Sequence, residues 1–157
     1  MTTEDQLNVA ETVYRYAYGV DTRDFELYRS IFAERVAFDF TSFQGGGDPV
    51  VMSADAWVAG VRSLFTRLAA TQHLMANPIA TVDGDTATCR MYVQAHHVYR
   101  PDDAASWYTI GGYYDDALVR SPDGPAGWLV TGVTLTVLWR RGDQRIMSLA
   151  AADGAHD

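Results

Sequence analysis

The sequence predicts an α+β protein in which three N-terminal helices pack on a strongly curved antiparallel, or mixed, β-sheet and form a cone with an internal pocket. Two observations predict this class. Apolar residues recur at helical spacing through most of the first 70 positions, whereas from Thr71 onward apolar and polar residues alternate and are interrupted by turns. The longest predicted strands also carry internal glycines, so we expect a bent sheet.

A first helix is predicted from about residue 3 to residue 19. Its buried face is marked by apolar side chains three and four positions apart: Leu7, Ala10, Tyr14 and Ala17. The next member of this series is Asp21, at the corner where the helix ends. Burying a carboxylate without a partner is costly, so Asp21 is expected to have a hydrogen-bonding or proton-sharing partner.

Two further helices and a strand are predicted before residue 70. Asp24 can cap a second helix, which carries its apolar residues on one face: Phe25, Tyr28 and Phe32. Alternation over residues 34–40 predicts a strand. Residues 45–49 form a glycine-rich loop that lacks the spacing of a phosphate-binding motif. Ser53 can cap a third helix that ends near Ala70.

The remainder of the chain is predicted to form an antiparallel meander. Asp83 and Gly84 mark its first turn, and the longest strands are expected at residues 85–100, 106–120 and 127–141. Bends or bulges are predicted at the glycines inside these strands: Gly111, Gly112 and Gly132. Residues 150–157 are expected to be a frayed end.

The composition predicts one soluble, cytoplasmic domain spanning residues 1–157. The chain is 48% hydrophobic, which is enough for a core without metal or disulfide support. Twelve basic against 20 acidic residues give a net charge of -8, which disfavours nucleic acid as a partner. The sequence contains no apolar run long enough to span a bilayer. The only cysteine, Cys89, excludes an internal disulfide and is expected to be a buried, inert thiol.

The strand predicted at residues 85–100 separates two adjacent histidines. One of its faces is mostly apolar and is expected to point inward: Ala87, Cys89, Met91, Val93, Ala95, His97 and Tyr99. His97 therefore faces the pocket and His96 lies with the polar set, unless a bulge between Val93 and His96 reverses them. Alternation does not settle the direction of His73, because both faces of its strand mix polar and apolar residues.

Three inward titratable groups, Asp21, His73 and His97, point to acid/base chemistry. A carboxylate that accepts from one imidazole nitrogen fixes the tautomer and leaves the other nitrogen free to remove a proton near neutral pH. Elimination, isomerisation and ring closure can proceed this way without metal or nucleotide. A zinc site is chemically possible, but these residues share no ligand spacing. The expected pocket-lining residues are Tyr16, Tyr18, Phe40, Trp57, Met91 and Tyr113.

Several segments resemble SnoaL-like members of the nuclear transport factor 2-like (NTF2-like) superfamily. They are residues 14–25, residues 30–34, the Thr71-Gln72-His73 run, the 83–85 turn, His97 and residues 127–132. The resemblance implies a cone of three helices against a curved sheet. It also implies that Asp21 orients His73 as general base, that His97 is a second catalytic histidine, and that Tyr16 stands where one dehydratase carries a functional tyrosine.

The expected function is a cofactor-independent dehydratase, isomerase or cyclase that acts on a hydrophobic polyketide, aromatic or terpenoid-like small molecule. No cofactor and no metal are expected. Two alternatives share the fold: a non-catalytic domain that binds a small molecule, and the small subunit of a ring-hydroxylating dioxygenase. The exposed sheet edges and the resemblance also predict a homodimer or homotrimer.

Overall fold

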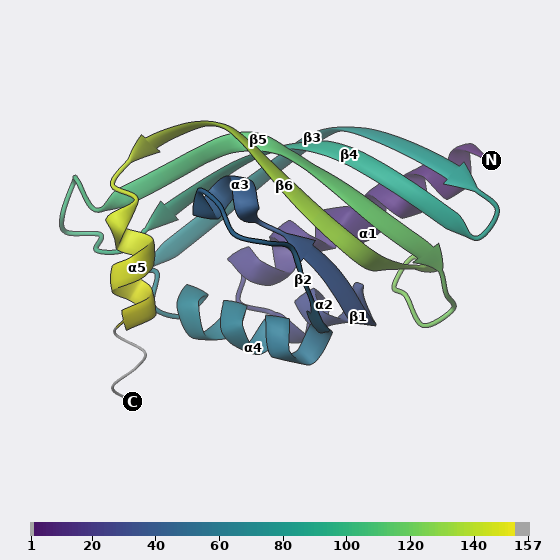
Figure 1. The fold of residues 1–157 in the computed structure, drawn as a ribbon, viewed down its shortest axis with the longest axis horizontal. Coiled ribbons are helices and arrows are strands. Elements are labelled where there is room, and N and C mark those ends of the chain that lie inside the picture. The colour runs from purple at the N-terminus through teal and green to yellow at the C-terminus, as the bar shows by residue number, and fades with distance from the viewer. Residues whose placement is uncertain (1, 153–157) are drawn as a thin grey trace.

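A computed structural model describes residues 2–152, in which six strands form one open, mixed sheet that arches over the helices (Figure 1). The strand order is β2-β1-β6-β5-β4-β3, and only the β1–β6 pair is parallel. The strands are β1 Phe32–Asp39, β2 Val50–Ser53, β3 Ala70–Asp83, β4 Thr86–Val98, β5 Trp107–Arg120 and β6 Trp128–Gly142. The α+β prediction with a curved mixed sheet is therefore confirmed.

Five helices accompany the sheet. They are α1 Thr3–Asp21, α2 Phe25–Ser30, α3 Thr41–Gln44, α4 Ala54–Phe65 and α5 Arg145–Ala152. Thr2 and Asp5 form a capping box at the start of α1, and Asp24 and Ser53 cap α2 and α4 as predicted. In the described part of the chain no helix is both long and apolar enough to cross a membrane.

The curvature of the sheet originates at irregular positions in its long strands. The β5–β6 register shifts at Gly111 and Gly112, where a Cβ on Gly112 would collide with the carbonyl oxygen of Thr136. A second shift, in the β3–β4 pairing, falls beside Asn77, whose φ is 56°. Bulges of this kind increase strand twist, so the concave face of the sheet encloses space beneath it.

The predicted alternation in β4 is confirmed along its whole length. Every second residue from Ala87 to His97 is buried, while the intervening residues are exposed. The β3–β4 pairing shows no shift between Val93 and His96. His97 therefore points into the interior and His96 points away from it.

Two local predictions in the first half of the chain are wrong, and one short strand was missed. The helix that begins at Phe25 ends at Ser30, and Phe32 starts β1 because its ring packs against Phe38 under the sheet. Phe40 does not continue that strand, because Asp39 accepts hydrogen bonds from Thr41 and turns the chain into α3. The short strand β2 was not predicted.

The third predicted helix and the C-terminus also differ from expectation. Helix α4 ends at Phe65 rather than near Ala70. At the C-terminus, Ile146 and Ala150 are buried, so α5 forms where fraying was expected, while residues 153–157 lie outside the described part. The burial of Ile146 and Ala150 is a tertiary contact, which a pattern of single residues does not encode.

Candidate active site

An inner cavity of about 370 Å³ lies between the helices and the concave face of the sheet. Its walls come from α1, α3, α4 and α5, from β2 and from strands β3 to β6. Aromatic and aliphatic side chains dominate the lining, and no Asp, Glu, Lys or Arg is among the residues that form it. Its few polar groups are the side chains of Tyr16, Gln44, His73, His97 and Tyr114. The cavity suits an uncharged, largely apolar molecule.

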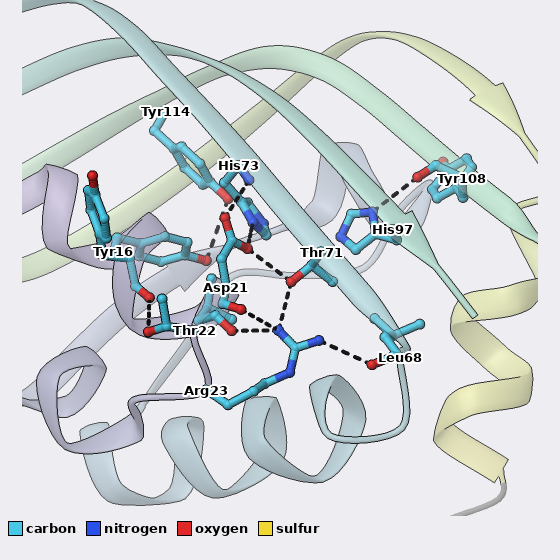
Figure 2. A network of polar contacts seen from close by, with 12 residues as sticks. Tyr16, Asp21, Thr22, Arg23, Leu68, Thr71, His73, His97, Tyr108 and Tyr114 are labelled. Atoms are coloured by element: carbon cyan, nitrogen blue, oxygen red, sulfur yellow. Dashed lines mark hydrogen bonds and ion pairs between the residues drawn. The ribbon is translucent and has the colours of Figure 1, made fainter. Parts of the chain in front are cut away.

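Asp21 and His73 form a hydrogen-bonded pair at the wall of this cavity (Figure 2). Nδ1 of His73 lies 2.7 Å from Oδ1 of Asp21, and the backbone N–H of His73 donates a 2.6 Å hydrogen bond to Oδ2. Because an ionised carboxylate can only accept, Nδ1 carries the hydrogen. Nε2 of His73 is left with a free lone pair and makes no hydrogen bond within residues 2–152.

The local sequence explains why these two groups meet. Asp21 is the last residue of α1, and close packing brings that end of the helix against α2, since a side chain on Gly19 would collide with Tyr28. On β3, Thr71 and His73 are two residues apart and point the same way. The hydroxyl of Thr71 donates a 2.9 Å hydrogen bond to Oδ1 of Asp21, so one strand face supplies three donors to one carboxylate.

These donors keep Asp21 ionised. Partial burial by itself would raise the pKa of the Asp21 carboxyl, but hydrogen bonds from His73, the charge of that ring when protonated and the Thr71 hydroxyl act in the opposite direction. Their combined effect is stronger, and the pKa of Asp21 lies below its ordinary value. The acidic member of the dyad is therefore a carboxylate over the neutral pH range.

His97 occupies the opposite side of the same space. Its ring centroid lies 5.6 Å from that of His73, and its Nδ1 donates a 3.2 Å hydrogen bond to the backbone carbonyl of Tyr108. Burial, with a smaller effect of His73, lowers the pKa of His97 to about 3. At neutral pH His97 is therefore uncharged, and its Nε2 can accept a hydrogen bond but has no hydrogen to donate.

Two tyrosine hydroxyls lie near the dyad. The hydroxyl of Tyr114 lies 3.5 Å from the hydroxyl of Tyr16, and the ring centroid of Tyr16 lies 6.2 Å from that of His73. Burial raises the pKa of both phenols, with a weaker opposing effect of the hydrogen bond at Tyr16. Both hydroxyls remain protonated. The Tyr114 hydroxyl donates to that of Tyr16, so the Tyr16 proton is free for an oxygen atom in the cavity, and the Tyr114 proton reaches such an atom when it rotates away from Tyr16.

The SnoaL-like domain family matches residues 1–134 of the chain. The chain belongs to this family. Among known relatives, protein Rv2910c of Mycobacterium tuberculosis, which is uncharacterized, is 29% identical over 120 residues, or 76% of this chain and 78% of that protein. The described structure thus has the cone fold of the NTF2-like superfamily, as the sequence predicted.

Solved structures support the same assignment. The Kfla4162 protein of Kribbella flavida is 28% identical, with a TM-score of 0.82 over 93% of this chain and 96% of that chain. A candidate aromatic ring hydroxylase of Novosphingobium aromaticivorans is 26% identical, with a TM-score of 0.79 over 94% and 99% of the two chains. A candidate scytalone dehydratase of that organism is 18% identical, with a TM-score of 0.75 over 92% and 93%, which is a similarity of fold alone.

Three of the six expected lining residues of this SnoaL-like protein, Tyr16, Phe40 and Trp57, do line the inner cavity. The other three do not. Tyr18 is 68% exposed on the outer side of α1, and Met91 is fully buried in the core below the cavity. Tyr113 lies on the convex face of the sheet, where the guanidinium of Arg90 stacks on it at 4.7 Å.

The sequence predicted Tyr113 as a lining residue, but in the structure its neighbour Tyr114 lines the inner cavity. The two faces of β5 both carry aromatic residues, so composition did not distinguish them. The β4–β5 register decides the matter: Tyr114 pairs with Met91 of the buried face, and Tyr113 pairs with Tyr92 of the exposed face. Extending the β4 alternation across this register would have identified Tyr114.

An outer groove of about 880 Å³ lies on the other side of the dyad, between α1 and β3. Asp21 and Thr71 line this groove, together with Glu11, Tyr18 and His96. Of the residues that line the inner cavity and the outer groove, His73 alone belongs to both. The imidazole therefore forms part of the wall between an apolar interior and a solvent-open surface.

The described residues include no group of three or more His, Cys, Asp and Glu side chains placed to hold a metal ion. Cys89 is buried in mid-strand, where burial first and the nearby Asp116 second raise the pKa of its thiol to about 12. A thiol with that pKa is not a nucleophile at neutral pH.

Proposed function

We propose that this SnoaL-like protein is a cofactor-independent acid/base enzyme, a dehydratase, isomerase or cyclase that uses the Asp21–His73 dyad. One observation carries the proposal. The Nδ1 atom of His73 is hydrogen-bonded to the Asp21 carboxylate, while its Nε2 lone pair belongs to a ring that lines a largely apolar cavity. This is the arrangement in which an imidazole serves as a general base.

The substrate is an uncharged hydrophobic molecule of one or two rings that carries oxygen substituents. The cavity of about 370 Å³ is near the lower end of the range for small-molecule sites. Its lining offers no charged side chain to pair with a carboxylate, phosphate or ammonium group of a ligand. Polyketide, aromatic and terpenoid-like ketones and alcohols meet these requirements.

Each polar group of the cavity has a proposed role. His73 removes a proton from the carbon next to a substrate carbonyl, and Asp21 stabilises the imidazolium that results. The hydroxyls of Tyr16 and Tyr114 donate to the carbonyl oxygen as it gains negative charge. His97, which is neutral, accepts a hydrogen bond from a substrate hydroxyl and orients it.

The proton balance closes without an external reagent. The electron pair of the broken C–H bond forms an enolate, and His73 holds the proton. In an isomerisation the proton returns to a different carbon. In a dehydration a hydroxyl on the next carbon leaves with the proton from His73, so that a carbon–carbon double bond and one water molecule form.

The similarity to proteins of known fold supports this class of chemistry at a coarse level. The SnoaL-like family includes catalysts that need no cofactor and also binding domains. A candidate scytalone dehydratase shares the fold of this chain. The assignment of a reaction to this protein therefore depends on the dyad and its cavity, since fold alone does not fix function.

Deuterium exchange tests the proposal across the whole predicted class of substrates. The protein is incubated in D₂O with a panel of uncharged cyclic ketones and β-hydroxyketones, and exchange next to the carbonyl and loss of water are followed by NMR. We expect catalysis with at least one compound and a decrease of about 10²-fold or more in His73→Gln. Tight binding without exchange or dehydration across the panel would contradict the proposal and favour a ligand carrier.

A second candidate function is an accessory role beside an oxygenase subunit. The observation in its favour is the 26% identity to a candidate aromatic ring hydroxylase over nearly the whole of both chains. Size-exclusion chromatography of the tagged protein from its native host distinguishes the two functions. Co-elution with an iron-containing larger chain would support the accessory role, and a homo-oligomer that is active alone would exclude it.

A further inference from the structure

Arg23 adopts a backbone conformation that arginine rarely takes. Its φ is 60°, in the left-handed region, directly after the residue that caps the end of α1. Glycine is the usual residue at this place because a Cβ makes the conformation unfavourable. A side chain retained at a strained position next to a proposed catalytic group points to a role for that side chain.

The guanidinium of Arg23 is held by a set of oxygen atoms (Figure 2). Its Nη1 donates to the backbone carbonyl oxygens of Val20, at 2.7 Å, and Asp21, at 3.3 Å. Its Nη2 donates at 3.2 Å to the carbonyl oxygen of Leu68, on the chain that leads from α4 into β3. These bonds join the end of α1 to the start of β3, the two elements that carry the dyad.

A fourth hydrogen bond links Arg23 to the dyad through Thr71. Nη1 of Arg23 donates at 2.8 Å to the hydroxyl oxygen of Thr71. Because that oxygen accepts from arginine, the single hydroxyl proton of Thr71 is directed to Oδ1 of Asp21, which lies 2.9 Å away. The order of donation is therefore from Arg23 to Thr71, from Thr71 to Asp21, and the carboxylate in turn accepts from His73.

We propose that Arg23 and Thr71 are positioning residues for the reaction, which fix the carboxylate of Asp21 in the plane that holds His73 for proton abstraction. This inference rests on the proposed function and extends it to two residues outside the cavity. Neither of them lines the inner cavity or touches a substrate there. Their effect on the reaction passes entirely through Asp21.

The charge balance agrees with this arrangement. Partial burial lowers the pKa of the Arg23 guanidinium, and the Asp21 carboxylate beside it acts in the opposite direction. Since this interaction is mutual, the cation also favours the ionised form of Asp21. Loss of either donor would leave the carboxylate with fewer partners and with freedom to rotate about its χ2 angle.

The test follows the dyad by NMR in the protein without ligand. Two quantities are measured: the pH midpoint of the Asp21 carboxyl carbon, and the rate at which the Nδ1 proton of His73 exchanges with water. The variants are Thr71→Val, Thr71→Ser, Arg23→Gly and Arg23→Lys. Thr131→Val and Arg35→Gln are matched controls, because these side chains bond to backbone carbonyls far from the dyad.

We expect the Asp21 midpoint to rise and the Nδ1 proton to exchange about fivefold faster in Thr71→Val and in Arg23→Gly, the change that corresponds to one lost hydrogen bond. Thr71→Ser keeps the hydroxyl and should retain the wild-type values, and Arg23→Lys should be intermediate. In an active assay Thr71→Val should lower kcat about tenfold and leave KM unchanged.

Arg23→Gly separates positioning from simple stabilisation, because glycine removes the backbone strain at the same position. If Thr71→Val and Arg23→Gly both kept the wild-type titration and proton exchange, the proposal would be wrong, whatever their Tm. These readouts require no substrate. A failure of the deuterium-exchange assay would therefore count against the proposed function without affecting this test.

Discussion

The Nδ1 atom of His73 lies 2.7 Å from Oδ1 of Asp21, and this contact crosses the wall between two spaces. Asp21 lines the outer groove, while the ring of His73 also lines the inner cavity. The negative charge therefore stays on the side that water reaches, where its ionisation costs least. In the proposed mechanism, the Nε2 atom faces the apolar cavity and removes a substrate proton there.

Replacement of Asp21 by asparagine should reduce activity far more than stability. The amide can hold the place of the carboxylate but cannot stabilise an imidazolium, and it can select the wrong tautomer of His73. We expect kcat/KM to fall about 10²- to 10⁴-fold in Asp21→Asn on any substrate found in the exchange assay. Steady-state kinetics and circular dichroism check this prediction.

Asp55→Asn is the matched control for that variant, because Asp55 lies on the surface of α4 with its side chain 82% exposed. Its kcat/KM should stay within about twofold of the wild-type value. An Asp21→Asn protein that retained more than about a third of wild-type activity would show that the dyad does not act as the base.

Removal of the tyrosine hydroxyls should lower the turnover rate while the fold is preserved. Tyr16→Phe and Tyr114→Phe each delete one donor that is proposed to face the substrate oxygen, and each keeps the packing of the ring. Loss of one such donor costs about 10²-fold in kcat. Tyr113→Phe, on the convex face, should have no effect. Equal rates in all three variants would remove both tyrosines from the proposed mechanism.

The strand half of the fold could be predicted from its turn residues and from β4, whose two faces differ clearly. The period of two in β4 identified its buried side from the sequence, and the turn residues placed the ends of β5 and β6 within one or two positions. Short elements were missed for a physical reason. The strand β2 and the helix α3 are only four residues long, too short to show a period, and α5 depends on tertiary contacts that bury Ile146 and Ala150.

The candidate site could be predicted only where the pattern of a single helix or strand determines the direction of a side chain. Strand parity identified His97. The helical series that led to Asp21 does not match the buried face of α1: Leu7 is 65% exposed, and Asp21 is half-buried and lines the outer groove. The buried face instead runs through Val9, Val13, Tyr16 and Val20. Resemblance to a family, rather than alternation, singled out His73, because its strand has two mixed faces. Tyr114 was missed because its direction follows from the register between β4 and β5, and Arg23 was missed because its position depends on a strained φ angle that the sequence does not show.

The buried His97 should make the folded protein less stable in acid. Its pKa is about 3 when folded, against 6.5 for an ordinary histidine, so between these values the unfolded chain binds a proton that the folded protein does not. Stability is therefore complete above pH 6.5 and decreases as the pH falls toward 3. At about pH 5 the loss from this group is about 2 kcal/mol.

Urea unfolding at several pH values measures this effect by comparison of wild type with His97→Asn. Asparagine can still donate to the carbonyl oxygen of Tyr108 but does not titrate. The variant should be less stable than wild type at neutral pH, and the difference between them should shrink by about 2 kcal/mol on going to about pH 5. A difference that stays constant with pH would mean that the titration of His97 does not cause the loss of stability in acid.

Asp116 should give the opposite pH dependence. Asp116 is 6% exposed on the inner face of β5, and its carboxyl group forms no hydrogen bond within residues 2–152. Burial, and then the charge of Asp115, raises the pKa of this carboxyl well above 3.8. The folded state thus keeps a proton that the unfolded chain loses, so stability decreases as the pH rises above 3.8.

Asp116→Asn removes this titration and preserves the shape of the side chain. We expect the variant to exceed wild type in Tm by about 3 °C or more at about pH 8 and to lose that advantage toward about pH 4, as measured by thermal unfolding. If the two proteins differed by the same amount at both pH values, Asp116 would not be the group whose ionisation destabilises the core.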